Sequence, residues 1–85
     1  MTRAEITAVV LKALSEVAPE IDPASVRPEA PLRDQVDLDS FDYLNFIVAI
    51  HAASRVDIPE ANYAKLGTVN DTVEYLAQHM ASGSG

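Results

Sequence analysis

The sequence predicts an all-α protein: a four-helix bundle with a long ordered loop between helices one and two and a short third helix. Apolar residues recur at helical spacing in three segments, 2–17, 40–54 and 68–80. A residue suited to capping a helix stands at the start of each segment. The chain has 85 residues, 48% of them hydrophobic, so one small core suffices for one domain.

The first helix is predicted to begin after Thr2. Glu5 follows three residues later, which is the spacing of a capping box. The apolar residues share one helical face: Ile6, Val9, Val10, Ala13, Leu14 and Val17. Pro19 cannot continue the helix and ends it.

A long connection, residues 19–39, follows the first helix and contains four of the five prolines. A connection of this length is unusual inside a compact domain. Apolar residues along it can hold it against the bundle: Ile21, Val26, Leu32, Val36 and Leu38. Asp22-Pro23 is suited to start one short helical turn. We therefore expect an ordered loop.

The second helix is predicted over Ser40 to Ser54, with Asp39 as its N-cap and Asp42 three residues on. Both acids lie at the positive end of the helix dipole. Ser40 is a first-turn residue pointing away from the core, at a terminus suited to a phosphate. It is either a polar residue at a helix start or a serine that an outside enzyme reads and modifies.

This helix is apolar on both sides. One side carries Tyr43, Phe46, Ile47, Ile50 and Ser54. The other carries Phe41, Leu44, Asn45, Val48 and Ala52. Such a helix is either wholly buried or buries one side against a partner. The second alternative fits a serine that must remain open to solvent.

The third helix is predicted to be short, opening at Ile58-Pro59 and running to about Lys65. Thr68, with Asp71 three residues later, caps a fourth helix. Its core side carries Val69, Val73, Leu76 and Met80. We expect a single domain over residues 1–80 and a flexible, low-complexity tail over 81–85.

Composition excludes several functions. A net charge of −7 argues against nucleic acid and anionic membranes as partners and favours basic protein surfaces. The chain has no cysteine, so disulfides, a thiolate nucleophile and the usual zinc clusters are excluded. The first residues lack a long apolar stretch, so we expect neither a signal peptide nor a transmembrane span, and a cytoplasmic protein.

No metal site or catalytic centre is expected. The acids between Asp34 and Asp42 lack the ligand and glycine spacing of an EF-hand. His51 and His79 are too few and too separated for a metal site or a triad, and Ser40 has no local base. The chain is therefore not expected to be an enzyme.

Four motifs together resemble the acyl carrier protein family. That family shows Asp-Ser-Leu-Asp, an Ile-Pro-Asp/Glu step, a Thr-Val helix start and a final apolar-Asp-Tyr-Ile run, in this order. The corresponding segments here are 39–42, 56–60, 65–69 and 73–76. Asp-Ser-Leu alone is a weak signal, whereas the ordered set at matching spacing is a strong one. Phe41 replaces the usual leucine, which bears on partners more than on modification.

The resemblance implies a carrier function. Ser40 would receive 4′-phosphopantetheine from coenzyme A through a phosphopantetheinyl transferase, with Asp39 and Phe41 flanking it. The arm would carry acyl groups as thioesters to loading and processing enzymes of a lipid or specialised pathway, and we expect a monomer. The expected partner surface is Asp39, Phe41, Asp42, Leu44 and Val48. The expected walls of an acyl pocket are Tyr43, Ile50, Ile58, Tyr63 and Leu66.

One departure from the family pattern points to a specialised carrier. Where many fatty acid carriers bear glutamates on the second helix, this chain has Asn45, His51, Ala52 and Ala53. Recognition would then depend less on charge and more on the apolar side of the helix. Two other classes stay open: an aminoacyl or peptidyl carrier, including the D-alanyl type, and an unmodified helical interaction module.

Overall fold

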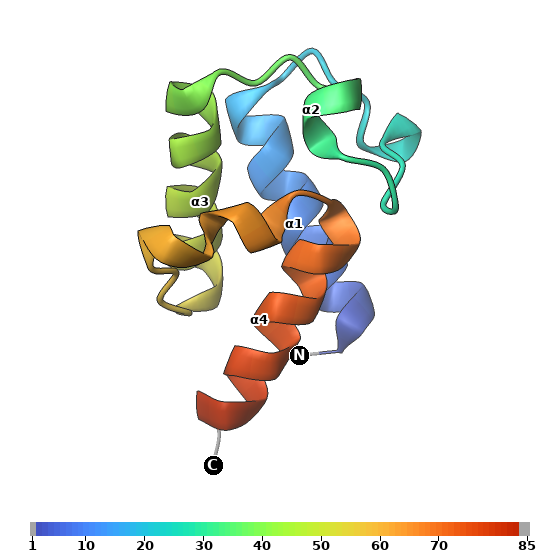
Figure 1. The fold of residues 1–85 in the computed structure, drawn as a ribbon. Helices are drawn as coiled ribbons and strands as arrows, with labels where there is room; N and C mark the ends of the chain where they lie inside the picture. The colour runs from blue at the N-terminus through green and yellow to red at the C-terminus, as the bar shows by residue number, and fades with distance from the viewer. Residues whose placement is uncertain (1, 84–85) are drawn as a thin grey trace.

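The predicted all-helical architecture is confirmed. In the computed structural model, residues 2–83 are described, with side chains up to residue 80. Six helical elements follow one another: α1 (Arg3–Val17), η1 (Pro23–Ser25), α2 (Leu32–Gln35), α3 (Ser40–Ser54), η2 (Glu60–Leu66) and α4 (Val69–Gly83). The described part of the chain contains no strand. Figure 1 shows α3 beside α1, with η2 crossing between α3 and α4.

Local caps fix where the helices begin. Thr2 Oγ1 accepts a hydrogen bond from the Glu5 amide (3.1 Å), and Glu5 Oε1 accepts one from the Thr2 amide (2.9 Å). This reciprocal pair is the predicted capping box. At α4, Thr68 Oγ1 accepts from the Asp71 amide at 2.9 Å. The starts of these helices can be predicted from the sequence because each cap joins residues only three positions apart.

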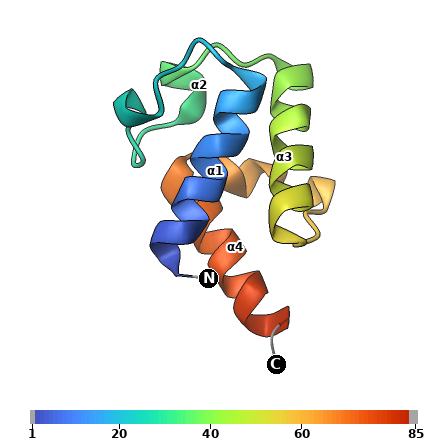
Figure 2. The same ribbon diagram turned by 180° about the vertical axis from the view of Figure 1, so that it is seen from behind.

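The core lies where α1 packs against α3 and α4, as the view from behind also shows (Figure 2). Its largest fully buried side chains come from all the longer elements: Phe46, Leu14, Ile50, Leu66, Leu76, Val10 and Val69. Thr72 is the buried polar residue among the described side chains, and its hydroxyl donates to the Thr68 carbonyl at 2.8 Å. The core is therefore apolar, with its polar group satisfied.

The loop between α1 and α3 is ordered, as predicted. Asp22 caps the short turn η1 by accepting from the Ala24 amide at 3.0 Å. Further on, two backbone bonds tie the loop to the start of α4. The Leu32 amide donates to the Gly67 carbonyl (2.8 Å), and the Asn70 amide donates to the Pro28 carbonyl (3.0 Å).

Helix α2 was not predicted. Its N-cap, Pro31, makes no side-chain cap bond, so the usual local start signal is missing. Buried Leu32 anchors it. Gln35 also holds it, because its side chain accepts from the Arg27 amide at 2.8 Å and donates to the Ala30 carbonyl at 3.1 Å. The helix is thus held by contacts within the loop and by the bond from the Leu32 amide to the Gly67 carbonyl.

The last two elements differ in detail from the expectation. η2 is a 3₁₀ helix and begins at Glu60, after Pro59. α4 continues to Gly83, three residues past the expected end of the domain at residue 80. The remainder of the predicted tail, residues 84–85, lies outside the described residues.

Candidate functional site

Ser40 is the first residue of α3 and is exposed, as predicted. Asp39 precedes it with extended backbone (φ −83°, ψ −179°), and its Oδ1 accepts from the Asp42 amide at 2.8 Å. The reciprocal bond of a capping box, from the Asp39 amide to the Asp42 side chain, is not formed within the described residues. Within the described residues the Ser40 hydroxyl makes no hydrogen bond. The helix start is therefore stabilised by Asp39, and the hydroxyl is left available.

Helix α3 presents two apolar sides, and only one is buried. Phe46 and Ile50 are 0% exposed and Ile47 is 3% exposed. On the opposite side Phe41 is 71%, Leu44 44% and Val48 56% exposed, and these are the three exposed large hydrophobic residues of the described chain. We call Phe41, Leu44 and Val48 the outer face. The first of the two arrangements, a wholly buried helix, is therefore wrong, and one apolar side of α3 is left exposed.

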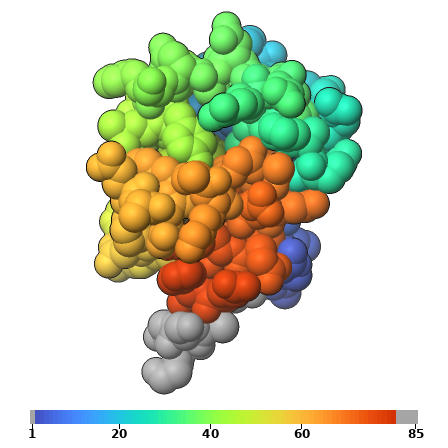
Figure 3. All heavy atoms as spheres, viewed as in Figure 1, coloured from blue at the N-terminus to red at the C-terminus, as the bar shows by residue number. Residues whose placement is uncertain are grey.

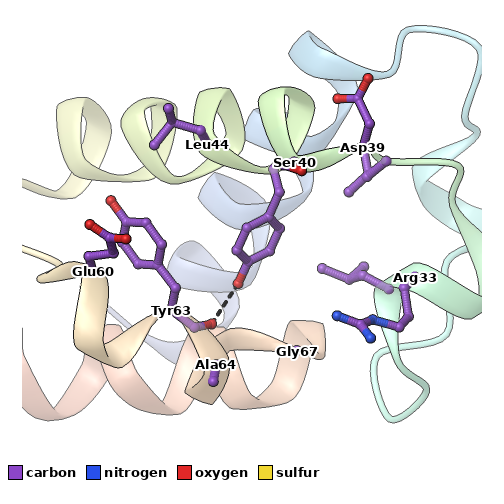
Figure 4. Close-up of a pocket in the computed structure, with 11 residues that line it drawn as sticks. Arg33, Asp39, Ser40, Leu44, Glu60, Tyr63, Ala64 and Gly67 are labelled. Atoms are coloured by element: carbon purple, nitrogen blue, oxygen red, sulfur yellow. Dashed lines mark hydrogen bonds between the residues drawn. The ribbon is translucent and has the colours of Figure 1, made fainter.

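A groove opens directly beneath Ser40, between α3, α2 and η2. Its cavity volume is about 910 Å³. Its walls are Leu32, Arg33, Leu38, Asp39, Ser40, Tyr43, Leu44, Glu60, Tyr63, Ala64 and Gly67. Figure 3 shows this face of the molecule, with the loop and α3 above η2 and α4. In Figure 4, Glu60 and Tyr63 lie toward one end of the groove and Arg33 toward the other.

Tyr43 crosses the groove and joins α3 to η2. Its hydroxyl donates to the Tyr63 carbonyl oxygen at 2.8 Å, the bond drawn as a dashed line in Figure 4. It also donates to the Leu66 carbonyl oxygen at 3.2 Å. Partial burial raises the pKa of the Tyr43 hydroxyl, and the nearby positive charge of Arg33 opposes that rise. The ring also stands edge-on to the ring of Tyr63, with centroids 6.4 Å apart.

The five residues expected to line an acyl pocket do not share one cavity. Tyr43 and Tyr63 line the groove beneath Ser40. Ile58 and Tyr63 line a second, smaller hollow beside Val48 and His51. Ile50 and Leu66 are fully buried in the core and line neither cavity.

Six groove residues were not among the predicted site residues: Leu32, Arg33, Leu38, Glu60, Ala64 and Gly67. The first three come from the loop, and their place depends on how the loop folds back over the start of α4. The apolar pattern assigned Leu38 only to holding the loop. No local signal marks Arg33 as a groove residue.

The histidines have structural contacts. His51 Nδ1 donates to the Val56 carbonyl at 2.8 Å and lies 3.7 Å from the exposed Asp57 carboxylate. The ring of His79 stacks on Tyr75 with centroids 4.0 Å apart. Within the described residues no three His, Cys, Asp or Glu side chains are grouped to hold a metal ion. Over the same part of the chain, every helix is too short or too polar to cross a membrane.

A family model described as a phosphopantetheine attachment site matches residues 8–76. This match defines the class as a carrier of a covalently attached arm. Curated relatives identify the family within that class. The acyl carrier protein of Desulforapulum autotrophicum is 34% identical over 71 residues, which are 84% of this chain and 92% of the relative. That of Thermosynechococcus vestitus is 32% identical over 78 residues, covering 92% and 90%.

The chain belongs to the acyl carrier protein family. Among solved structures, an acyl carrier protein from Enterococcus faecalis has the same fold, with a TM-score of 0.72 at 21% identity and coverage of 93% of this chain and 99% of that one. Members of the family are carriers and not enzymes; they carry acyl groups on covalent 4′-phosphopantetheine. They are served by a phosphopantetheinyl transferase and by acyl-processing enzymes.

The residues around Ser40 fit this group. The hydroxyl is exposed and unbonded within the described residues, so it is open to an enzyme. The first amides of α3 have no acceptor within the helix, which suits a phosphate at this position. The adjoining groove offers apolar and aromatic walls to an attached chain. When bound, the arm supplies a thiol that forms thioesters.

Proposed function

We propose that Ser40 carries the 4′-phosphopantetheine arm and that the chain delivers acyl groups to enzymes of a lipid or specialised biosynthetic pathway. One observation carries the proposal. The serine of the Asp-Ser-Phe-Asp motif begins α3, stands exposed at the edge of a groove and takes no part in capping.

The chemistry at Ser40 is a phosphoryl-type transfer performed by a separate enzyme. The Ser40 oxygen forms a bond to the β-phosphorus of coenzyme A, and the bond from that phosphorus to the nucleotide breaks. The hydroxyl proton passes to a base of the transferase. Magnesium and basic side chains of that enzyme neutralise charge on the transferred group. This chain contributes an unhindered hydroxyl, and it later raises the effective concentration of its cargo at each partner.

Partner recognition is assigned to the outer face together with Asp39 and Asp42. An exposed apolar row beside the modified residue is a suitable docking surface for an enzyme. The absence of the glutamate row on α3 supports a dedicated pathway with hydrophobic recognition. The cytoplasmic location and monomeric state remain predictions.

An experiment on the attachment site separates a carrier from an unmodified interaction module. The protein is incubated with coenzyme A and a broad-specificity phosphopantetheinyl transferase, and its mass is measured. The wild type should gain one arm. Ser40→Ala should keep its helical circular dichroism spectrum and gain none. Ser25→Ala removes a different exposed serine and should be modified like the wild type. Modification that persists in Ser40→Ala contradicts the assignment.

The aminoacyl or peptidyl carrier, including the D-alanyl type, is the second candidate. The Leu38-Asp39-Ser40 lead-in, in place of the family's frequent Gly-x-Asp-Ser, favours carriers outside core fatty acid synthesis, and this candidate is one of them. Both candidates need the arm on Ser40, so they differ only in the enzyme that loads it. Incubating the holo-protein with acyl-activating and amino-acid-activating enzymes and weighing the products decides between them.

A further inference from the structure

The groove beneath Ser40 contains one strongly basic side chain, Arg33. Arg33 lines the groove beneath Ser40, whereas no lysine or arginine lines the second hollow. In Figure 4 it lies across the groove from Glu60 and Tyr63, below Ser40. A guanidinium stays charged at every physiological pH.

Within the described residues Arg33 makes neither an ion pair nor a side-chain hydrogen bond. The acidic residues beside Ser40 do not form an ion pair with Arg33. Asp39 uses its carboxylate to cap α3, and in Figure 4 this carboxylate points up and away from the groove. Glu60 lies at the opposite end. Arg33 lines the groove that Tyr43 crosses, and its positive charge opposes the rise in the pKa of the Tyr43 hydroxyl.

We propose that Arg33 binds the phosphodiester of the arm on Ser40 and so turns the arm into the groove between α2 and η2. The proposal rests on the proposed function, since it needs the arm at Ser40. The phosphodiester is a permanent anion attached to one wall of the groove that Arg33 also lines. Arginine matches phosphate oxygens with two parallel N–H donors.

Arg33 acts here as a positioning residue. With its phosphodiester held at the Arg33 end of the groove, the arm would reach Tyr63 only by running along the groove to its opposite end. The pair is exposed to solvent, so its effect is moderate and falls with salt. We expect about a two- to fivefold preference for the arm in the groove at low salt, as for exposed ion pairs.

The test uses holo-protein of the wild type and of Arg33→Gln, Arg33→Lys and Lys12→Gln. Lys12→Gln makes the same change of charge on an exposed residue of α1 that lines neither cavity. Mass spectrometry first verifies the arm in each. The phosphorus-31 resonance of the arm and the nitrogen-15 resonance of the Arg33 guanidinium are then recorded at low and high salt.

The wild-type phosphorus resonance should differ from that of Arg33→Gln at low salt and move toward it at high salt. Arg33→Lys should fall between them, because it keeps the charge and loses the paired donors. Lys12→Gln should match the wild type. The Arg33 guanidinium resonance should shift when the apo-protein becomes holo, and millimolar inorganic phosphate added to apo-protein should not reproduce that shift.

Equal phosphorus resonances in Arg33→Gln and the wild type would overturn the proposal. So would an equal shift with inorganic phosphate, because the groove would then be a general anion site and tethering would be irrelevant. Failure of the wild type to gain the arm at all is a different result. It contradicts Ser40 as the attachment site, and Arg33 then has no phosphodiester to bind.

Discussion

The two sides of α3 carry similar apolar side chains, but one side is buried and the other is exposed. Phe46 on the inner side is completely buried, while Phe41, five residues earlier, is 71% exposed. The inner residues meet α1 and the rest of the core, whereas nothing in the described chain covers the outer face. The same kind of residue thus stabilises the fold on one side and is left exposed to solvent on the other. Truncating side chains on each side of α3 should therefore have different effects on stability.

The largest effect is expected on the inner side. Phe46→Ala removes a fully buried ring and should lower the free energy of unfolding by about 3–5 kcal/mol. A small domain has only about 5–15 kcal/mol of stability in total, so the variant approaches unfolding. Urea denaturation followed by circular dichroism measures the loss. Phe46→Leu, a milder deletion, keeps the measurement possible if Phe46→Ala does not fold. A loss near zero for both would show that the inner side is not part of the core.

A smaller effect is expected at Tyr43, on the boundary between the two sides. Tyr43→Phe removes the hydrogen bonds to the Tyr63 and Leu66 carbonyls and should cost about 1 kcal/mol. Tyr63→Phe is the matched control, because the Tyr63 hydroxyl makes no hydrogen bond within the described residues, and it should change stability by less than about 0.5 kcal/mol. Equal losses in the two variants would contradict the role of the Tyr43 hydroxyl.

The Tyr43 contribution should also depend on pH. Burial raises the folded-state pKa of Tyr43 above its ordinary value of 10.0. A raised pKa gives stability that is fully present below pH 10 and is lost as the pH rises through the folded-state value. The stability difference between the wild type and Tyr43→Phe should therefore narrow above pH 10. A constant difference across this range would indicate that Tyr43 ionises equally in both states.

On the outer side, deletion should leave the fold almost unchanged. Phe41→Ala and Leu44→Ala should each alter the free energy of unfolding by less than about 0.5 kcal/mol, since both positions are exposed. Each should strongly reduce loading by the cognate enzyme, because both lie in the proposed docking surface. A variant that unfolds, or that loads at the normal rate, is not a docking contact. If both do so, the hydrophobic recognition is wrong and the Ser40 assignment stands.

The smallest expected effect is a response to salt. Acids gather before and at the start of α3: Asp34, Asp37, Asp39 and Asp42. Their repulsion should weaken the fold at low ionic strength, and added salt or divalent cations should raise the melting temperature modestly. A melting temperature that stays flat or falls between low and moderate salt would count against it.

The sequence predicted what depends on neighbouring residues. Thr2, Asp39 and Thr68 mark their helix starts because a cap bonds to an amide three residues on. The two sides of α3 follow from helical periodicity in the same way. The exposure of Ser40 follows from its first-turn position beside an aspartate that already caps the helix.

What depends on distant residues was not predicted. Helix α2 exists because buried Leu32 bonds to Gly67, far along the chain, and Arg33 enters the groove with it. Ile50 and Leu66 were expected as pocket walls from the resemblance to the family, whereas in the structure both are fully buried and line neither hollow. Arg55 ends α3 in the left-handed conformation at φ 62°, where glycine is the usual signal.

Two adjacent side chains at the start of α3 have different roles. Asp39 caps the helix, whereas the Ser40 hydroxyl makes no hydrogen bond within the described residues. Substituting the Ser40 oxygen therefore breaks no bond on which folding depends, and the domain should have the same shape with and without its arm. Under the proposed function, loading and unloading could then repeat without a folding transition, and partner enzymes would tell an empty carrier from a charged one by contact with the arm and its cargo.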